Sequence, residues 1–299
     1  MRQPIKISDT DQDLTAGSRA DNYWERNPNA RYYELLRPGF PFAKVLKRKN
    51  NVKILTDKFR VNAVGFGNWL SIEDRINYVN AAVVALADLN KVLQFGNNVG
   101  IDGSLSLSFG ARGNSRAAAH YEPATQLINI TRFKRGKGHK FYRFFSTGGI
   151  GALAHEYGHF LDYFSGSYLD KDNKVFSLSG GSIVEKNRVN NKTELRGIVD
   201  DIIERIIWTT PGKTLSPYYN RLLNKNKRAG DYFFRRNELF ARAFEVFVSV
   251  ELKKKNIINR LLVPTKYDLD YYLSDDEMRR IAPLFKKLIK GIRAKIKQN

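Results

Sequence analysis

Apolar residues recur at steps of three and four in several stretches of the chain, and this spacing predicts amphipathic helices. The clearest helix begins at Ser71 and Asp74, which form a capping-box pattern, and runs to Leu93. A second is expected from about Thr147 to Phe164, with glycines in its first turn that indicate close backbone packing. Further helical periods follow at residues 193–208, 217–226 and 236–252.

Strand patterns are fewer and lie before the second of these helices. Leu105–Phe109 alternates with serine, and residues 23–70 predict irregular structure with one or two short strands. Ala117–Tyr121 and Gln126–Thr131 flank a turn-forming tetrapeptide, which predicts a hairpin. The pattern therefore predicts an α+β fold that is mostly helical, with a small sheet before the helix that ends at Phe164.

The end of the chain carries a second capping box, Ser274 with Glu277. Pro283 is expected to break this segment into two helices, because proline is tolerated in a first turn and not in a helix interior. From Pro283 to Asn299 one face is apolar and the rest is rich in lysine and arginine, with no acid. Such a helix suits nucleic-acid phosphates, an anionic membrane surface, or a solvated basic face on a packed helix.

These patterns suggest three parts. Residues 1–22 are polar and predict a disordered tail. Residues 23–262 form the main domain, with a core at about 60–250, and residues 263–299 form a basic helical extension. A basic insert, Arg132–Arg143, precedes the helix that ends at Phe164.

Composition narrows the chemistry. The 299 residues include no cysteine, which excludes disulfides, a thiolate nucleophile and cysteine-bound zinc. The net charge of +21 favours nucleic acid, an anionic surface or an acidic partner, or else reflects a solvated basic surface. Met1 to Ala20 has no apolar core of a secretory signal, and no run of about eighteen apolar residues predicts a membrane span.

Two of the four histidines lie in one pentapeptide, His155-Glu156-Tyr157-Gly158-His159. On a helix, His155 and His159 lie one turn apart on one face and could hold one zinc ion together. Glu156 points to the neighbouring edge, where it could accept a proton from an attacking water. The plainer alternative is a pair of exposed histidines on a surface helix.

A catalytic zinc site needs a third protein ligand, and residues 237–245 offer a candidate. In the helix expected there, Glu238, Arg242 and Glu245 share one face. Large apolar residues occupy the opposite face. Glu238 could reach the metal, or it could form an ordinary i,i+4 pair with Arg242; the spacing leaves both open.

The pentapeptide with Asp162, and the later stretch Glu238-Leu239-Phe240-Ala241-Arg242-Ala243-Phe244-Glu245, resemble the paired helices of gluzincin metallopeptidases. They are similar to the lethal-factor-type toxin proteases in particular. The resemblance implies a zincin-like fold with one zinc ion per chain, and it makes Glu238 the third ligand beside His155 and His159. Arg242 departs from the toxin pattern, which has Glu at that position.

The same resemblance gives roles to residues around the ligands. Tyr232 lies near the position of a tyrosine that steadies the tetrahedral intermediate in the toxin relatives. Asp162 either orients a ligand imidazole or serves as a surface or capping residue, and Glu245 is placed among the supporting carboxylates. Zincins generally carry a strand before the metal-binding helix that pairs with substrate. His120 and Tyr121 of the hairpin would then line the cleft, or else form the polar tip of a packed hairpin.

A broader set of motifs, in one order, resembles the first type of large polyvalent protein-associated domain, which occurs in proteins of bacteriophages and conjugative elements. The resemblance covers roughly residues 60–250. The motifs are Phe66-Gly67-Asn68-Trp69, Phe109–Gly113, Ala119–Pro123, Ile128–Thr131, Leu153–Asp162 and the Glu238 stretch. Members are predicted zincins, so the resemblance implies a metallopeptidase. The insert at 132–143 and an excursion at 165–192 depart from the shorter family pattern.

The expected function is hydrolysis of protein or peptide substrates in the cytoplasm of a bacterial host or with a virion. Glu156 would activate water, and zinc would be the cofactor. The alternative is a basic nucleic-acid-associated protein with a structural or residual zinc site, which would bind through residues 132–143 and 284–299.

Overall fold

The computed structural model describes residues 31–46, 51–68, 70, 72–111, 117–132, 149–170, 176–182, 194–226 and 231–298. The chain divides into two compact units, and each is described by itself below. Unit 1 is Met1–Leu153 with Asn256–Pro264, and unit 2 is Ala154–Lys255 with Thr265–Asn299. The tail expected at 1–22 and residues 133–143 of the basic insert lie outside the described residues. Residues 263–299 are expected as an extension, whereas the structure includes Thr265–Asn299 in unit 2.

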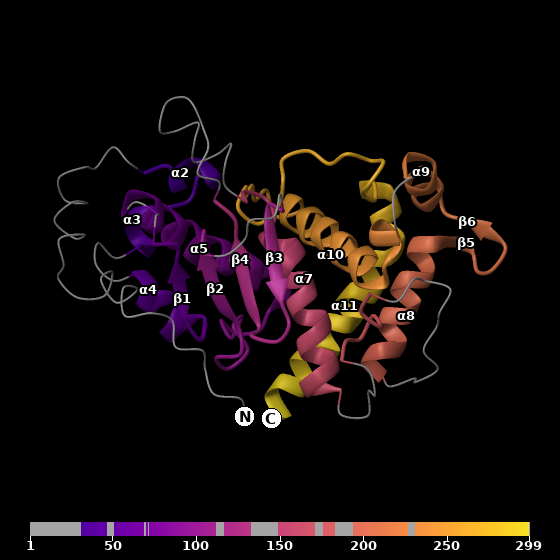
Figure 1. Cartoon of the computed structure of the whole chain (residues 1–299), viewed down its shortest axis with the longest axis horizontal. Coiled ribbons are helices and arrows are strands. Elements are labelled where there is room, and N and C mark those ends of the chain that lie inside the picture. Colours follow the sequence, from indigo (N-terminus) through magenta and orange to yellow (C-terminus); the bar gives the residue numbers. More distant parts are fainter. Residues whose placement is uncertain are drawn as a thin grey trace. The chain divides into compact units, whose positions relative to one another are not determined.

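Unit 1 contains a four-stranded sheet with the order β1-β2-β4-β3 (Figure 1). Its strands are β1 (Val64–Phe66), β2 (Ser106–Phe109), β3 (Ala119–Glu122) and β4 (Leu127–Ile130). β1 and β2 pair in parallel, as do β2 and β4, while β3 and β4 are antiparallel with Ala119 opposite Ile130. The expected hairpin and the expected strand before it are therefore confirmed. β3 ends the sheet order, so its outer edge has no strand partner within the described residues.

The helix expected after Ser71 is α5 (Ile72–Leu93), which is confirmed, although Ser71 itself lies outside the described residues. Its inner face buries Val83, Leu86 and Leu89 almost completely. The ring of Tyr78 stacks on Phe109 of β2 at a centroid distance of 5.0 Å, so α5 packs against the sheet. Shorter helices complete the unit: α2 (Tyr33–Leu36), α3 (Phe42–Val45), α4 (Asn51–Lys53) and the π-helical turn η2 (Ile54–Lys58).

The helix that carries the histidine pair is α7 (Leu153–Phe164), and it begins later than the sequence predicts. Residues 149–152 are not helical. Gly151 has a φ of 92°, in the left-handed region that a right-handed helix cannot include. A Cβ on Gly149 would lie 2.0 Å from the Ala118 carbonyl oxygen, so the expected close backbone packing is confirmed.

Unit 2 is mainly helical, and its helices continue the chain after α7 (Figure 1). They are the π-helical turn η3 (Ser165–Leu169), α8 (Glu194–Ile207), α9 (Pro217–Lys225), the 3-10 turn η4 (Asp231–Phe234), α10 (Arg236–Lys253) and α11 (Asp275–Gln298). A two-stranded ribbon of β5 (Trp208–Thr210) and β6 (Thr214–Leu215), which the sequence patterns do not predict, separates α8 from α9. In the described part of the chain, no helix is long and apolar enough to cross a membrane.

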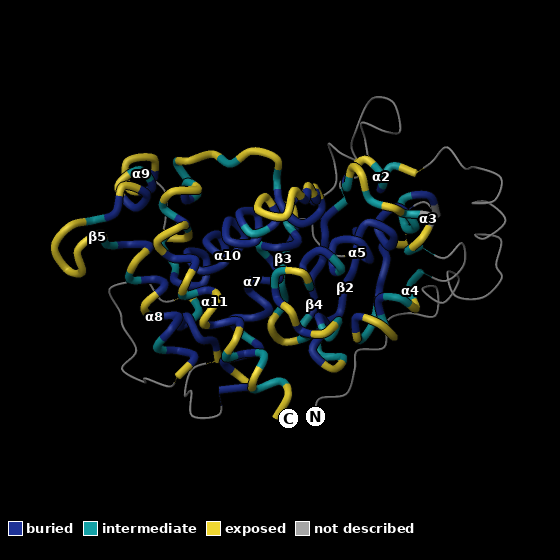
Figure 2. The backbone as a smooth tube through the Cα atoms, turned by 180° about the vertical axis from the view of Figure 1, so that it is seen from behind, coloured by how far each residue is buried: buried dark blue, intermediate teal, exposed yellow. Residues whose placement is uncertain are grey.

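Helix α10 is buried along nearly its whole length (Figure 2). The rings of Phe244 and Phe247 lie 6.0 and 5.1 Å from the ring of Phe285 on α11. α11 also packs against α8. These contacts form the aromatic core of unit 2, and they position the one face of α10 that is rich in charged residues.

The break expected at Pro283 is wrong, because α11 is one helix with Pro283 inside it. Its capping box is confirmed: the Glu277 amide donates to Ser274 Oγ, and the Ser274 amide donates to Glu277 Oε2. An interior proline costs about 3 kcal/mol in lost bonding and crowding. Pro283 and Arg279, the residue whose carbonyl the proline cannot pair with, are both exposed, so this part of the helix lies at the surface. Buried apolar residues on both sides of the proline, including Ile281 and Phe285, offset the remaining cost.

Candidate metal centre

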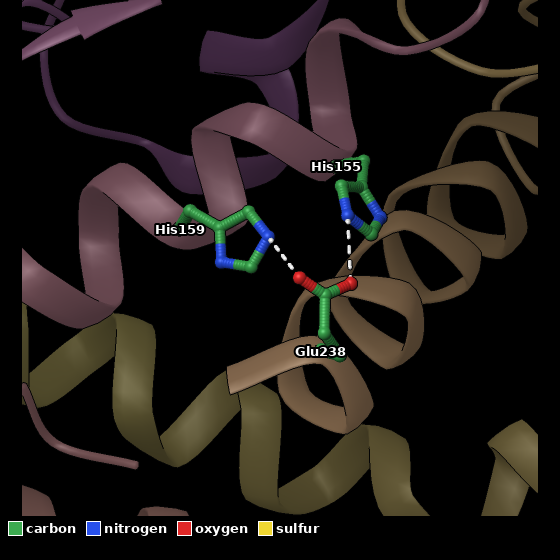
Figure 3. Close-up of side chains that lie close together, drawn as sticks. All are labelled: His155, His159 and Glu238. Atoms are coloured by element: carbon green, nitrogen blue, oxygen red, sulfur yellow. Dashed lines mark ion pairs between the residues drawn. The ribbon is translucent and has the colours of Figure 1, made fainter. Parts of the chain in front are cut away.

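His155, His159 and Glu238 converge in unit 2, where one nitrogen or oxygen from each lies within 4.8 Å of the others (Figure 3). His155 Nε2 is 3.6 Å from Glu238 Oε2, and His159 Nε2 is 3.4 Å from Glu238 Oε1. Both imidazoles come from α7, with ring centroids 4.9 Å apart, and the carboxylate comes from the first turn of α10. The exposed-histidine alternative is wrong, since His159 and Glu238 are only 7 % and 6 % exposed.

The donor set suits a metal ion. Each carboxylate oxygen of Glu238 lies beside one imidazole nitrogen, at 3.6 Å from His155 and at 3.4 Å from His159. Imidazole nitrogen and carboxylate oxygen are donors that zinc accepts in the absence of cysteine. The group could therefore bind a metal ion.

Close packing of α7 on α10 brings the ligands together, and Gly158 permits it. A Cβ at this position would lie 3.1 Å from Phe244 Cδ1 and 3.2 Å from Ala241 Cα. Gly158 lies between the two histidines in sequence, so the absence of its side chain lets the facing turn of α10 approach. Tyr157, fully buried, contacts the same helix through Phe244, with ring centroids 6.3 Å apart.

Electrostatics couple the three ligands strongly. Burial lowers the pKa of His155, but hydrogen bonds with Glu238 and Glu245 outweigh it and raise that pKa to about 10. Burial raises the pKa of Glu238, but its hydrogen bonds with the two imidazoles lower it overall, far below the ordinary value. Because a ligating imidazole is neutral, metal binding at this site would release a proton from His155.

A second carboxylate supports His155 from the side away from Glu238. Glu245 Oε2 lies 3.4 Å from His155 Nδ1, and Glu245 is only 2 % exposed. The hydroxyls of Tyr267 and Tyr272 also hydrogen-bond to Glu245. Burial raises the pKa of Glu245, although the hydrogen bonds with His155 and the two tyrosines favour the ionised form. This geometry lets Glu245 orient the His155 ring, as supporting carboxylates do in metal sites.

Tyr267 and Tyr272 have no role in the sequence analysis. They lie in the non-helical segment between α10 and α11, where no periodicity relates them to Glu245. The sequence offers one indication of their role, which is that both tyrosines follow soon after the helix that carries Glu238.

Arg242 does not pair with Glu238, so the i,i+4 alternative is wrong. Its guanidinium donates to the Phe233 carbonyl and lies over the Phe233 ring, 5.5 Å from the centroid. It thereby fixes η4, the turn that carries Tyr232. The place that Glu occupies in the toxin pattern thus holds a cation that positions a neighbouring turn, and the supporting carboxylate is Glu245 instead.

Tyr232 lies beside the cluster, as the resemblance implies. Its hydroxyl hydrogen-bonds with Glu238, and it is 49 % exposed, so its ring reaches solvent from the metal site. Burial of the hydroxyl and the nearby Glu238 charge raise its pKa above the ordinary value. The hydroxyl therefore stays protonated and able to donate at neutral pH.

Glu156 is adjacent to the cluster and is not one of the three grouped donors. It is 6 % exposed, and its charge acts on both His155 and Tyr232. It therefore lies on the ligand helix close to a ligand histidine and to Tyr232, where a proton acceptor could serve a substrate held at the site.

Asp162 is fully buried and binds Ser179 rather than an imidazole. Its two carboxylate oxygens accept hydrogen bonds from the Ser179 amide at 2.7 Å and the Ser179 hydroxyl at 2.5 Å. His159 Nδ1 is buried and has no hydrogen-bond partner among the described residues. Asp162 therefore fastens the segment 176–182 to α7. The expected surface position is wrong, because Asp162 is fully buried.

Arg236 holds the other side of the segment 176–182. Its Nε donates to the Ser179 carbonyl at 2.5 Å, and its guanidinium also pairs with Asp200 of α8. The Asn237 amide donates to the Gly181 carbonyl at 3.1 Å. The first turn of α10, which carries Glu238, is thereby tied to α7 and α8. No sequence motif points to Arg236, Ser179 or Asp200.

His120 and Tyr121 belong to β3 of unit 1, and both are partly exposed. They face Asn129 and Ile128 across the antiparallel pair with β4. Their expected contact with substrate stays a prediction.

Comparison with known families gives one finding. Residues 224–296 match the family model of large polyvalent protein-associated domain 1. The match includes α10 with Glu238, the two tyrosines that bind Glu245, and most of α11. It overlaps the expected range, about 60–250, at residues 224–250, so the resemblance is confirmed there, and it extends beyond that range at the C-terminal side. The histidine pentapeptide precedes the matched residues. No curated protein and no solved structure matches the chain.

Proposed function

We propose that the protein is a zinc-dependent metallopeptidase of the gluzincin type, with a zincin-like catalytic fold. The convergence of His155, His159 and Glu238 beside Glu156 carries this proposal. Glu156 favours catalysis over a purely structural site, because a hydrolytic zinc site needs a proton acceptor beside its ligands.

The number of donors supports a catalytic site over a structural one. Structural zinc sites are closed by four protein ligands, whereas catalytic sites have three and keep a position open. Within the described residues, the grouped donors are three. We infer zinc because the donors are two imidazoles and a carboxylate, and because cysteine is absent from the chain.

The residues around the site suit peptide hydrolysis. A bound zinc ion would supply Lewis acidity toward water and the scissile carbonyl. Glu156 would accept the proton of the attacking water and deliver it to the leaving amine. Tyr232 would donate a hydrogen bond to the oxyanion that develops on the carbonyl. Glu245 would hold the His155 ring in its ligating orientation.

The family match supports a role for the protein in the biology of mobile elements. We propose that it acts on protein or peptide substrates inside a bacterial host cell or with a virion.

Replacing Glu156 by Gln tests the proposal. The side chain keeps its size and loses its basicity, so zinc should stay at about one ion per chain while cleavage falls by roughly 10²- to 10⁴-fold. Both quantities are measured on purified protein, by elemental analysis and by mapping new N-termini in a bacterial proteome. Wild-type protein and the variant are compared under the same conditions.

Glu194→Gln is the matched control, since Glu194 is an exposed acid at the start of α8. It should keep both the metal and the cleavage. Identical cleavage maps for wild type and Glu156→Gln, or no cleavage by either protein, would contradict the proposal and favour a binding protein with a structural metal site.

A further inference from the structure

Helix α11 presents two chemically different faces. Its apolar residues are buried: Met278, Ile281, Ala282, Phe285, Leu288, Ile289 and Ile292. They pack within unit 2, against α8 and α10. A helix that lies in a membrane surface needs its apolar face for the lipid. Because α11 already uses this face in the protein core, insertion of α11 into a membrane surface is excluded as long as the unit is folded.

The opposite face carries a row of cations. Lys286, Lys290, Arg293 and Lys297 follow one another at steps of four, three and four, so they line one side of the helix. At 1.5 Å per residue the row extends over roughly 16 Å. No acid occurs from Met278 to the end of the helix.

Part of this charge is not neutralised locally. Lys286 Nζ lies 3.5 Å from Glu251. Lys290 and Lys297 of the row, and Lys287 next to Lys286, are exposed and form no ion pair with any residue that the structure describes. Three uncompensated cations on one helix face repel each other, and a polyanion would relieve that repulsion.

Two exposed aromatic rings lie on or beside the turn η3, which packs against α11. Tyr168 is 46 % exposed, and its ring stacks on Phe164 at a centroid distance of 5.1 Å. Phe176 is 84 % exposed and is tied to the same turn, because Ser167 Oγ donates to the Phe176 carbonyl at 2.8 Å. The ring of Tyr168 is thus supported on one face by Phe164 and reaches solvent elsewhere.

We propose that the cationic row of α11, together with Tyr168 and Phe176, binds single-stranded nucleic acid. Cations that follow a phosphate backbone and aromatic rings that accept unstacked bases are the two components of such sites. A duplex would use the cations and would leave the rings without partners, because its bases are already stacked. The proposal is independent of peptidase activity.

The test compares binding of a fluorescent oligothymidylate by wild type and by Lys287→Gln/Lys290→Gln/Lys297→Gln. Anisotropy titrations at several salt concentrations give the affinity and its salt dependence. On a single strand each lost phosphate contact lowers the slope of log K against log salt by about 0.7, so three lost contacts should lower it by about 2. Affinity at low salt should fall at least tenfold.

Lys213→Gln/Lys255→Gln/Lys266→Gln is the matched control, because it removes the same net charge from exposed lysines of unit 2 outside α11. Its slope should stay close to that of wild type. Equal slopes for the two triple variants would overturn the proposal, since binding would then follow net charge alone. Binding of anionic vesicles in preference to the oligonucleotide would overturn it as well.

Tyr168→Ala tests the aromatic part. Loss of one stacked base should weaken oligothymidylate binding by roughly 5- to 100-fold and should leave duplex binding unchanged. If Tyr168→Ala binds both forms as wild type does, the site is a phosphate-binding surface with no preference for single strands, and the proposal is wrong. Zinc content and circular dichroism of each variant check that the fold persists.

Discussion

Helices α10 and α11 belong to the same unit, but α10 buries charged side chains and α11 exposes them. α10 buries four charged side chains, and each meets a defined partner: Arg236 meets Ser179 and Asp200, Glu238 meets the two histidines, Arg242 meets Phe233, and Glu245 meets His155. α11 buries only apolar residues and leaves its lysines in solvent.

The difference separates buried charges, which need partners within the fold, from exposed charges, which are solvated by water. A buried charge without a partner costs several kcal/mol, so a helix keeps four of them only where the surroundings are arranged around them. On α10 that arrangement is the cluster of His155, His159 and Glu238 and the turns next to it. The exposed lysines of α11 need no partner within the protein. Any function that they have must therefore involve a ligand or another molecule. The comparison predicts that substitutions on α10 have large effects on metal binding and stability, and that substitutions on the exposed face of α11 have small effects on both.

The largest expected effect is that of Glu238→Ala. It removes a ligand, so metal affinity should fall by more than the roughly 10- to 100-fold typical of losing a supporting residue. Competition with a chromophoric chelator measures the affinity. Glu251→Ala is the matched control, because Glu251 lies on the same helix and pairs only with Lys254 and Lys286 among the described residues. If Glu245→Ala removes the metal while Glu238→Ala retains it, the third ligand is misassigned.

A smaller effect is expected for Glu245→Gln. It keeps the size of the side chain and removes the charge that orients His155, so metal affinity should fall by roughly 10- to 100-fold while about one ion still binds at saturation. The absorption spectrum of the cobalt-substituted protein should also shift, since it reports ligand geometry. Unchanged affinity and an unchanged spectrum would show that Glu245 only fills space.

Tyr267→Phe and Tyr272→Phe sharpen the same prediction. Each removes one hydrogen bond to Glu245 and leaves the carboxylate in place. Each should weaken metal binding less than Glu245→Gln does. Equal losses in all three variants would mean that the tyrosines hold the segment 265–273 rather than the carboxylate.

Much of the fold was predictable from local sequence. The long period of α5, the turn between β3 and β4, and the capping box of Ser274 are local signals, and the structure confirms the elements they predict. The failures come from non-local terms. Pro283 is accommodated because residues distant in sequence bury the helix on both sides of it, and the parallel pairing of β1, β2 and β4 joins segments separated by long connections.

The candidate site divides in the same way. His155, Glu156 and His159 follow from spacing on one helix, and Glu238 follows from the motif resemblance. The sequence does not show that Glu245, and not the residue at position 242, supports His155, because Arg242 and Glu245 lie on one face of α10. The positions of Phe233, Tyr267 and Tyr272 decide which residue faces His155. Asp162 likewise has a suitable position in sequence, and Ser179 occupies both of its oxygens.

The smallest expected effect concerns the close approach of α7 to α10. Replacing a helical glycine by alanine normally stabilises a protein by about 0.5–1 kcal/mol. At Gly158 the new methyl group would press on Ala241 Cα and on Phe244, and overpacking of this kind costs about 1–3 kcal/mol. Gly158→Ala should therefore lower the midpoint of chemical unfolding. It should also weaken metal binding, because it pushes Glu238 away from the histidines.

Two other helical glycines supply the controls. At Gly197 of α8 a Cβ would meet nothing within 4 Å, so Gly197→Ala should raise the midpoint. At Gly291 of α11 it would meet only the flexible end of Leu195, at 2.8 Å, so Gly291→Ala should be nearly neutral. If Gly158→Ala instead stabilises the protein as Gly197→Ala does, the interface between α7 and α10 is loose. The ligand cluster would then be held by its charges rather than by the packing of its helices.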